Sequence, residues 1–158
     1  MGPLNNPILR DTVRNDWIDY NGHMNDSAYA LVFSMAVDQF MEDLGIDTEF
    51  REKHQFSIYT LETHLIYLKE AQEGQDLHVN IQLLDYDLKR MHVFFTMENR
   101  QGNRLATSEQ LLMGMDMSQG RAAPFPTLVQ SRIESFGKLH QGLSKPAEAG
   151  RKIGIRKK

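Results

Sequence analysis

The residues best suited to chemistry are concentrated in one short run, Asp16 to Asn25 (DWIDYNGHMN). Its carboxylates have the chemistry to attack an acyl carbon or to remove a proton from water. Asn25, Asp26 and Ser27 favour the start of a helix, where unpaired backbone N–H groups stabilise negative charge. A carbonyl group bound at such a helix start is polarised toward attack. The run therefore suits acyl transfer or acyl hydrolysis.

The same residues also allow a purely structural interpretation. Asn21-Gly22 is a common pair in connecting turns, and Asp16 or Asp19 would serve equally well as a capping or ion-pairing residue. The imidazole of His23 is as suited to holding the loop by hydrogen bonds as to moving a proton. Residue types alone leave both interpretations open.

A long amphipathic helix is predicted directly after this run. Its apolar face has helical spacing and ends before Gly45, a residue typical of helix ends; it comprises Ala28, Leu31, Val32, Met35, Ala36 and Phe40. A first strand is expected before it, over Ile8–Asp16 and ending at Trp17. Residues 46–55 are expected to form a surface loop or a short turn of helix.

The rest of the chain has the pattern of strands joined by short turns. Four strands are predicted, at Ser57–Leu68, Leu77–Leu83, Met91–Glu98 and Leu105–Met117. In the second, His78, Asn80 and Gln82 alternate with apolar residues and are expected to face solvent. Pro124 and Pro126 should break the chain before a terminal helix over Thr127–Leu143, with Leu128, Ile133 and Phe136 facing inward.

This order of elements predicts an α+β fold. Successive short connections imply an antiparallel sheet, and the single long helix should cover one face of it. The other face would be a large exposed apolar surface, so a second subunit is expected to cover it.

Composition and charge exclude several classes of protein. The chain has 158 residues, of which 41% are hydrophobic and 25% charged, which suits one globular domain (residues 1–143) followed by a flexible basic tail (144–158). The net charge of −3 combines an acidic domain with a basic tail, and an acidic domain is a poor surface for nucleic acid. We therefore expect no nucleic-acid partner. We also expect no membrane helix and no secretory signal, because no apolar run is long enough.

Cysteine and histidine usage limits the cofactors. The chain has no cysteine, which excludes disulfides, zinc–cysteine sites, iron–sulfur clusters and thiol nucleophiles and fits a cytoplasmic protein. The six histidines form no H-x-x-x-H pair, so no metal is expected.

The segment from Asp19 to Asn25, followed by Tyr29, resembles the signature of hotdog-fold thioesterases, the 4-hydroxybenzoyl-CoA thioesterase-like superfamily. The resemblance covers Ile8 to His140 and includes Glu62-Thr63-His64, Tyr67-Leu68 with Gly74, and Pro124-Phe125-Pro126. The form of the run from Asp16 is most similar to the thioesterases that cleave betainyl-CoA in bacterial carnitine breakdown.

The resemblance implies a curved antiparallel sheet wrapped around one long central helix. It implies a homodimer joined edge to edge, often paired into a homotetramer, with active sites at the dimer interface near the helix start. The implied activity is hydrolysis of a short or small polar acyl-CoA, such as betainyl-CoA, to the free acid and CoA. Coenzyme A enters as part of the substrate, and no other cofactor is expected.

The resemblance also assigns roles to individual residues. Asp19 matches the catalytic carboxylate, as nucleophile or general base, with His23 and Asn25 in the catalytic set. The expected substrate-binding residues are Trp17, Tyr20, Asn21, Gly22, Asp26, Glu62 and His64. Because some subfamilies take their carboxylate from elsewhere, Glu62 and Glu109 are alternatives to Asp19, although both would also fit as paired or solvent-facing strand residues.

Substrate binding raises two further expectations. A betainyl group carries a quaternary ammonium, which aromatic faces bind, and the aromatic candidates are Trp17, Tyr20, Tyr59 and Tyr67. Trp17 and Tyr20 flank Asp19, but they fit equally well as core or lip aromatics. The phosphates of CoA need cations, for which the candidates are Lys89, Arg90, Arg100, Arg104 and Arg121.

Two other functions remain open at this stage. The first is a hotdog hydratase or dehydratase, which would need an acid/base pair such as Asp19 and His23. The second is an acyl-CoA-binding module without catalysis.

Overall fold

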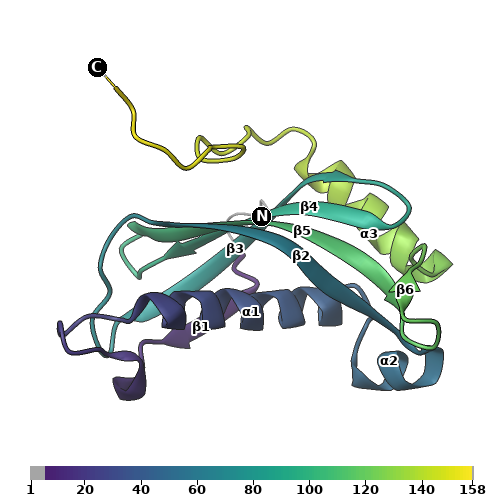
Figure 1. Cartoon of the computed structure of the whole chain (residues 1–158), viewed down its shortest axis with the longest axis horizontal. Helices are drawn as coiled ribbons and strands as arrows, with labels where there is room; N and C mark the ends of the chain where they lie inside the picture. The colour runs from purple at the N-terminus through teal and green to yellow at the C-terminus, as the bar shows by residue number, and fades with distance from the viewer. Residues whose placement is uncertain (1–5, 158) are drawn as a thin grey trace.

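The computed structural model describes residues 6–157 and has the predicted α+β architecture. One antiparallel sheet curves around the long helix α1 (Asp26–Asp43) (Figure 1). Its strands, in the spatial order β1-β3-β4-β5-β2, are β1 (Leu9–Thr12), β3 (Asp76–Tyr86), β4 (Arg90–Glu98), β5 (Arg104–Asp116) and β2 (Phe56–Tyr67). The short β6 (Arg121–Ala122) pairs with β5. We call the sheet face toward α1 concave and the opposite face convex.

Helix α1 begins and ends as its sequence predicts. The Asn25 side chain accepts a hydrogen bond from the backbone N–H of Ser27 and caps the first turn. At the other end Gly45 has φ +89°, a conformation that glycine adopts without steric cost. The N–H groups of Gly45 and Ile46 bond back to the carbonyls of Glu42 and Met41, which closes a Schellman motif.

The buried face of α1 differs from the predicted one. Leu31 is 47% exposed, and Met35 is only half-buried. The other four predicted residues, Ala28, Val32, Ala36 and Phe40, are buried as expected. The buried stripe is broader than predicted, because it also includes Tyr29, Phe33, Val37 and Met41. A helix lying in a concave sheet contacts it along both flanks, so the stripe is wider than one packed on a flat surface would be.

The first strand is shorter than predicted. β1 ends at Thr12, where its partner strand begins at Asp76, and a 3₁₀ turn, η2 (Asn15–Trp17), follows. The segment after α1, expected as a loop or short helical turn, contains the short helix α2 (Thr48–His54). The four later strands lie within two residues of their predicted ends, apart from β3, which extends three residues further.

The terminal helix α3 (Thr127–His140) covers the edge of β3 that β1 leaves open. The backbone N–H of Leu83 donates to Nδ1 of His140 at 2.8 Å, and the rings of Phe40 and Phe136 meet with centroids 5.4 Å apart. Ile133 faces inward as predicted, but Leu128 is 57% exposed and Val129 is buried instead. An open strand edge is thereby covered within the chain.

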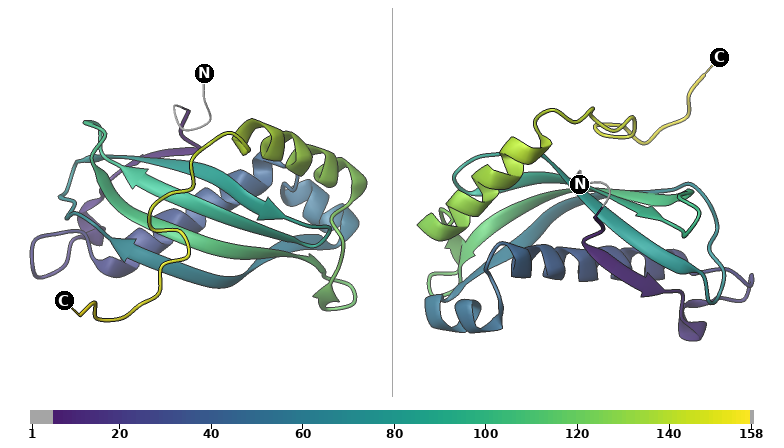
Figure 2. Two further views of the ribbon diagram at one scale, coloured as in Figure 1. Left: turned by 90° about the horizontal axis from the view of Figure 1, so that it is seen from above. Right: turned by 180° about the vertical axis from the view of Figure 1, so that it is seen from behind.

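The segment after α3 crosses the convex face toward β2 (Figure 2). The Gln82 amide donates to the carbonyl of Ser144, Glu148 forms an ion pair with Arg104 at 2.7 Å, and the N–H of Gly150 donates to Glu109. Asn80 and Gln82 are consequently buried, and His78 is half-buried, so the prediction that this face of β3 is solvent-exposed was wrong. No helix among residues 6–157 is long and apolar enough to span a membrane.

Candidate active site

The signature loop is a compact turn held by its own backbone. Ile18 and Met24 form an antiparallel bridge, and the N–H of Asp19 donates to the carbonyl of His23 at 3.0 Å. The chain reverses at Gly22, whose φ of +81° requires glycine or strain. The loop is joined to α1 because the N–H of Asn25 donates to the carbonyl of Trp17 at 2.8 Å. The signature residues therefore lie together at the start of α1, as predicted.

The carboxylate of Asp19 is held in a defined orientation. Its Oδ1 accepts a hydrogen bond from the backbone N–H of Asn21 at 2.9 Å. Its Oδ2 has no protein hydrogen-bond partner among residues 6–157. The side chain is half-buried and lines a cavity. One oxygen thus fixes the side chain while the other is available to a substrate or a water molecule.

The start of α1 supplies hydrogen-bond donors beside this carboxylate. The first helical N–H groups have no acceptor one turn earlier. The N–H of Ser27 is used by the Asn25 cap and that of Ala28 by the Asn25 carbonyl, whereas that of Asp26 has no protein acceptor within the described part of the chain. This N–H and the positive end of the helix dipole suit an anionic or polarised oxygen.

A cavity of about 350 Å³ brings these groups together. One wall comes from the loop and α1, and the other from the end of β2 and the segment that follows it. The lining residues are Asp19, Asn21, His23, Met24, Asp26, Tyr29, Tyr67, Leu68, Lys69 and Glu70. Sequence reasoning missed Lys69 and Glu70, because nothing in the chain order shows that the segment after β2 lies against the loop.

The two walls are joined by side-chain contacts. His23 Nε2 lies 3.1 Å from a carboxylate oxygen of Glu70, and the Met24 N–H donates to the carbonyl of Ala71. The hydroxyl of Tyr67 donates to the carbonyl of Asp26 at 3.2 Å. Burial raises the pKa of Tyr67, with a smaller contribution from the charge of Asp26, so the phenol keeps its proton at neutral pH.

Two of the predicted aromatic residues lie outside the cavity. Trp17 is only 6% exposed and packs in the core, with the Arg14 guanidinium 4.6 Å from its ring centroid. Tyr20 is 96% exposed at the tip of the loop. The aromatic residues that do line the cavity are Tyr29 of α1 and Tyr67 at the end of β2.

Glu62 and His64 lie on the other face of the sheet. They pair with Leu111 and Glu109 of β5, and Glu109 accepts a hydrogen bond from the N–H of Gly150, in the segment that crosses the convex face. The imidazole of His92 is also 2.7 Å from Glu109. Within one chain, Glu62, His64 and Glu109 therefore do not meet Asp19.

Most of the basic residues considered for CoA phosphates are already engaged. Arg90 pairs with Asp87 at 2.6 Å, and Arg104 pairs with Glu148. Arg100 lies 3.9 Å from Asp76. Lys89 and Arg121 form no ion pair among residues 6–157, and Lys69 is the lysine that lines the cavity.

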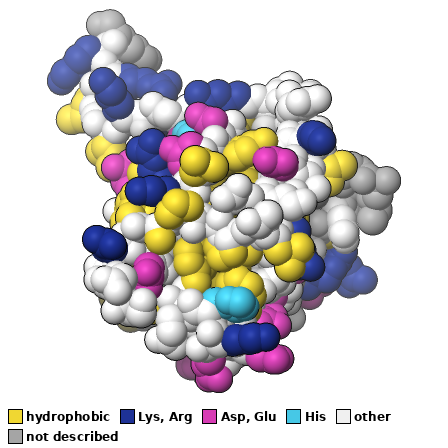
Figure 3. Space-filling model, turned by 90° about the vertical axis from the view of Figure 1, so that its right-hand side faces the viewer, with side chains coloured by type: hydrophobic (Ala, Val, Ile, Leu, Met, Phe, Trp, Pro, Cys, Tyr) yellow, Lys and Arg dark blue, Asp and Glu magenta, His cyan; other side chains and the backbone are white. Residues whose placement is uncertain are grey.

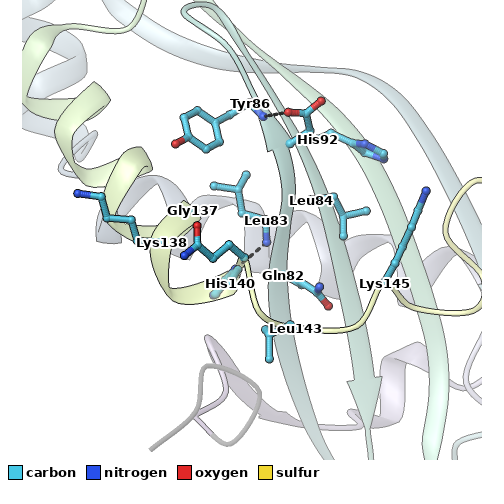
Figure 4. Close-up of a pocket in the computed structure, with 12 residues that line it drawn as sticks. Gln82, Leu83, Leu84, Tyr86, His92, Gly137, Lys138, His140, Leu143 and Lys145 are labelled. Carbon is cyan, nitrogen blue, oxygen red and sulfur yellow. Dashed lines mark hydrogen bonds between the residues drawn. The ribbon is translucent and has the colours of Figure 1, made fainter.

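Other cavities lie away from the signature loop. One of about 470 Å³ lies between β3, β4, α3 and the following segment, and includes His140 and Lys145 (Figure 4). An apolar one of about 250 Å³ is lined by Leu88, Phe125 and Ile133, at the α2 and α3 end of the molecule, where hydrophobic side chains gather (Figure 3). No group of three or more His, Cys, Asp or Glu in residues 6–157 is arranged to hold a metal ion.

The sequence of this chain matches a known protein family. The family model of the thioesterase-like superfamily matches residues 13–133. The chain is 40% identical over 141 residues to a betainyl-CoA thioesterase of Pseudomonas aeruginosa, which is 89% of each chain. It is 36% identical over 154 residues to an L-carnitine dehydrogenase/betainyl-CoA thioesterase of Rhizobium meliloti, covering 97% of this chain and 30% of that protein.

Solved structures of similar proteins superpose on this fold. A Staphylococcus aureus protein determined in complex with CoA superposes with a TM-score of 0.89 at 32% identity over 94% of each chain. A putative thioesterase from Pseudomonas putida superposes with a TM-score of 0.84 at 35% identity, over 96% of this chain and 97% of that one. The predicted hotdog fold and family are thereby confirmed, and the chain belongs to the thioesterase-like superfamily as a thioester hydrolase.

Proposed function

We propose that this protein is an acyl-CoA thioesterase whose substrate is betainyl-CoA. The observation that carries the proposal is the placement of the Asp19 carboxylate at the start of α1, in a cavity bounded by the signature loop. The acyl group is inferred from the identity of 40% with a betainyl-CoA thioesterase. The relatives that join this activity to an L-carnitine dehydrogenase support a place in carnitine breakdown.

In the proposed reaction, the thioester carbonyl oxygen accepts the N–H of Asp26 and is polarised by the helix dipole. The Asp19 carboxylate then either attacks the carbonyl carbon or removes a proton from an attacking water. CoA leaves as a thiolate, which is a good leaving group because thiols have a pKa near 8.5. No cofactor other than the CoA of the substrate takes part.

His23 and Asn25 act around this centre rather than on it. Asn25 holds the helix start through its cap, and His23 joins the loop to Glu70. His23 Nε2 faces Glu70 and not Asp19, so the acid/base pair that a hydratase would require is not formed. The hydrolase is therefore the better supported of the two reactions.

A homodimer joined along β2 is part of the proposal. β2 is the outermost strand on its side of the sheet, and Tyr59 and Leu61 are 44% and 50% exposed along it. A long, open and partly apolar edge favours pairing with a second strand. Light scattering coupled to size-exclusion chromatography distinguishes the monomer, dimer and tetramer. A cytoplasmic location is proposed as well, because that is where acyl-CoA substrates are available.

The experiment that tests the activity is release of free thiol from a panel of small acyl-CoA esters. The protein has no cysteine, so a thiol-reactive dye reports only liberated CoA. We expect hydrolysis of betainyl-CoA that is lost in Asp19→Asn. Tight binding of CoA esters without turnover would instead identify a non-catalytic binding module, and absence of both would refute the proposed ligand.

One turnover in H₂¹⁸O with enzyme in excess tests the route. Label in the Asp19 carboxylate, which mass spectrometry of the peptide detects, shows that Asp19 attacks the carbonyl and that water opens the resulting anhydride at the Asp19 carbon. Label in the released acid alone fits either general-base catalysis or an anhydride opened at the acyl carbon. Turnover in hydroxylamine distinguishes these two, because only the anhydride converts Asp19 to a hydroxamate.

A further inference from the structure

The active-site cavity is lined by two tyrosine rings held in fixed positions, one from each of its walls. Tyr29 and Tyr67 meet edge to face, with centroids 5.3 Å apart and planes at 87°. The hydroxyl of Tyr29 donates to the carbonyl of Lys69, and that of Tyr67 donates to the carbonyl of Asp26. Both rings are therefore oriented by the backbone before any ligand arrives. Tyr67 remains 49% exposed, so one part of its ring is open to the cavity.

The charged side chains that line this cavity are mostly acidic. Asp19, Asp26 and Glu70 line the cavity, against a single lysine, Lys69. No lysine or arginine lies within ion-pair distance of Asp19 or Asp26 among residues 6–157, and Glu70 meets only the imidazole of His23. Such a cavity favours a cationic acyl group and disfavours an acyl group that ends in a carboxylate.

The position of Tyr67 relative to the helix start matters for a short acyl chain. The residue whose carbonyl accepts the Tyr67 hydroxyl, Asp26, is the residue whose N–H is free to polarise the thioester. In a betainyl thioester the ammonium nitrogen is two bonds from the carbonyl carbon. A carbonyl oxygen at the Asp26 N–H consequently leaves the trimethylammonium group in the cavity that Asp26 and Tyr67 both line.

We infer that Tyr67, supported by Tyr29 and accompanied by the Asp26 carboxylate, forms the subsite for the quaternary ammonium of the acyl group. This inference rests on the proposed function and adds the residues that select the substrate. It narrows the aromatic candidates from the sequence, Trp17, Tyr20, Tyr59 and Tyr67, to Tyr67, because the other three do not line the cavity. Aromatic faces and carboxylates attract quaternary ammonium groups without needing a hydrogen-bond donor from them.

A pair of substrates of equal shape isolates this contact. Betainyl-CoA and 3,3-dimethylbutanoyl-CoA differ only in the nitrogen or carbon that carries the three methyl groups, so one is cationic and the other neutral. The charge also makes the betainyl thioester intrinsically more reactive. We call the ratio of kcat/KM for betainyl-CoA to kcat/KM for the neutral ester the selectivity. The selectivity of each variant is compared with that of the wild type, because the difference in intrinsic reactivity then cancels.

We expect Tyr67→Leu to lower this selectivity about tenfold, with kcat/KM for the neutral ester falling much less. Tyr67→Phe keeps the ring but loses the hydrogen bond to Asp26, so it should retain most of the selectivity. Asp26→Asn should lower selectivity several-fold by removing the nearby charge. Tyr86→Leu is the matched control, because Tyr86 is another half-exposed tyrosine, on β3, that does not line the cavity, and it should leave the ratio unchanged.

Equal losses for both esters in Tyr67→Leu would overturn the inference, because Tyr67 would then serve only packing. Thermal unfolding of each variant verifies that it folds. The same experiment tests the proposed function separately. A wild-type protein that hydrolyses neither ester would refute both the proposed function and the ammonium subsite. A wild type that hydrolyses both esters, with a selectivity that no variant changes, would refute only the ammonium subsite.

Discussion

His23 Nε2 lies 3.1 Å from a carboxylate oxygen of Glu70, across 47 positions of the sequence. The contact joins the signature loop to the segment after β2, and so joins the two walls of the active-site cavity. Glu70 is 71% exposed, so the contribution of this pair to overall stability is small. The effect of this contact is local, because it holds the signature loop beside the segment after β2 that forms the opposite side of the cavity.

Removing the charge of this pair should therefore affect turnover more than folding. We expect Glu70→Gln to lower kcat/KM for betainyl-CoA by less than about tenfold and to change the free energy of unfolding by less than about 0.5 kcal/mol. Steady-state kinetics and urea denaturation measure the two quantities. A loss of activity as large as that of Asp19→Asn would show that Glu70 takes a direct part in the reaction.

Asp19→Asn separates the chemical role of Asp19 from its role in the turn. The amide oxygen of Asn can still accept the hydrogen bond from the N–H of Asn21, so the loop should keep its shape. We expect kcat/KM to fall by at least about 100-fold, while the unfolding midpoint stays the same. Asp19→Ala should lose the same activity and also the turn hydrogen bond, which is worth about 1 kcal/mol.

If Asp19→Asn keeps more than a tenth of the wild-type activity, the carboxylate must come from elsewhere. Glu62→Gln and Glu109→Gln are then the variants to compare. Both lie on the convex face of their own chain, so either role would require a second copy to bring them to the site.

Asn25→Ala should weaken the start of α1. The Asn25 side chain accepts hydrogen bonds from both the N–H and the hydroxyl of Ser27. Loss of such a cap costs about 1 kcal/mol and lowers the melting temperature by about 2–4 °C in a domain of this size. Asn25→Ser is the matched control because serine also caps helices, and it should recover most of the stability. Equal destabilisation by both variants would contradict a capping role.

His140 should make the stability of the protein depend on pH. Its Nδ1 accepts the N–H of Leu83, so the neutral ring carries its proton on the other nitrogen. Burial lowers the pKa of His140 below its usual 6.5, so the unfolded chain takes up a proton at a higher pH than the folded one. The contribution of neutral His140 to the free energy of unfolding is therefore complete above pH 6.5 and is lost as the pH falls through the lower pKa of the folded state.

Urea denaturation between pH 5 and pH 8 measures this dependence. His140→Gln keeps an acceptor for the Leu83 N–H but cannot titrate, so part of the decrease at low pH should disappear. His140→Phe leaves that N–H buried without a partner, which costs about 1–3 kcal/mol at any pH. Identical pH profiles for the wild type and His140→Gln would show that His140 does not contribute.

The local features of this protein could be predicted from its sequence. Each depends on neighbours in the chain: the Asn25 cap, the turn at Gly22, the helix end at Gly45 and the succession of strands after Phe56. Short-range hydrogen bonds and side-chain periodicity determine such features, so their signal is contained in a few consecutive residues.

The tertiary structure decided which faces are covered. Alternation in β3 separates Asn80 and Gln82 from their apolar neighbours but does not reveal that the segment after α3 buries them. Alternation also places Glu62 and His64 on a shared face, and only the register of β2 with β5 shows that this face is turned away from the signature loop.

The tertiary structure also decided which residues form the wall of the active-site cavity opposite the signature loop. Tyr67 and Glu70 reach Asp26 and His23 because β2 pairs with β5 and ends beside the start of α1. The sequence by itself determined the loop, its carboxylate and the helix that begins there. Only the folded sheet decided which aromatic and acidic side chains face that carboxylate, because strand pairing joins residues that are far apart in the chain.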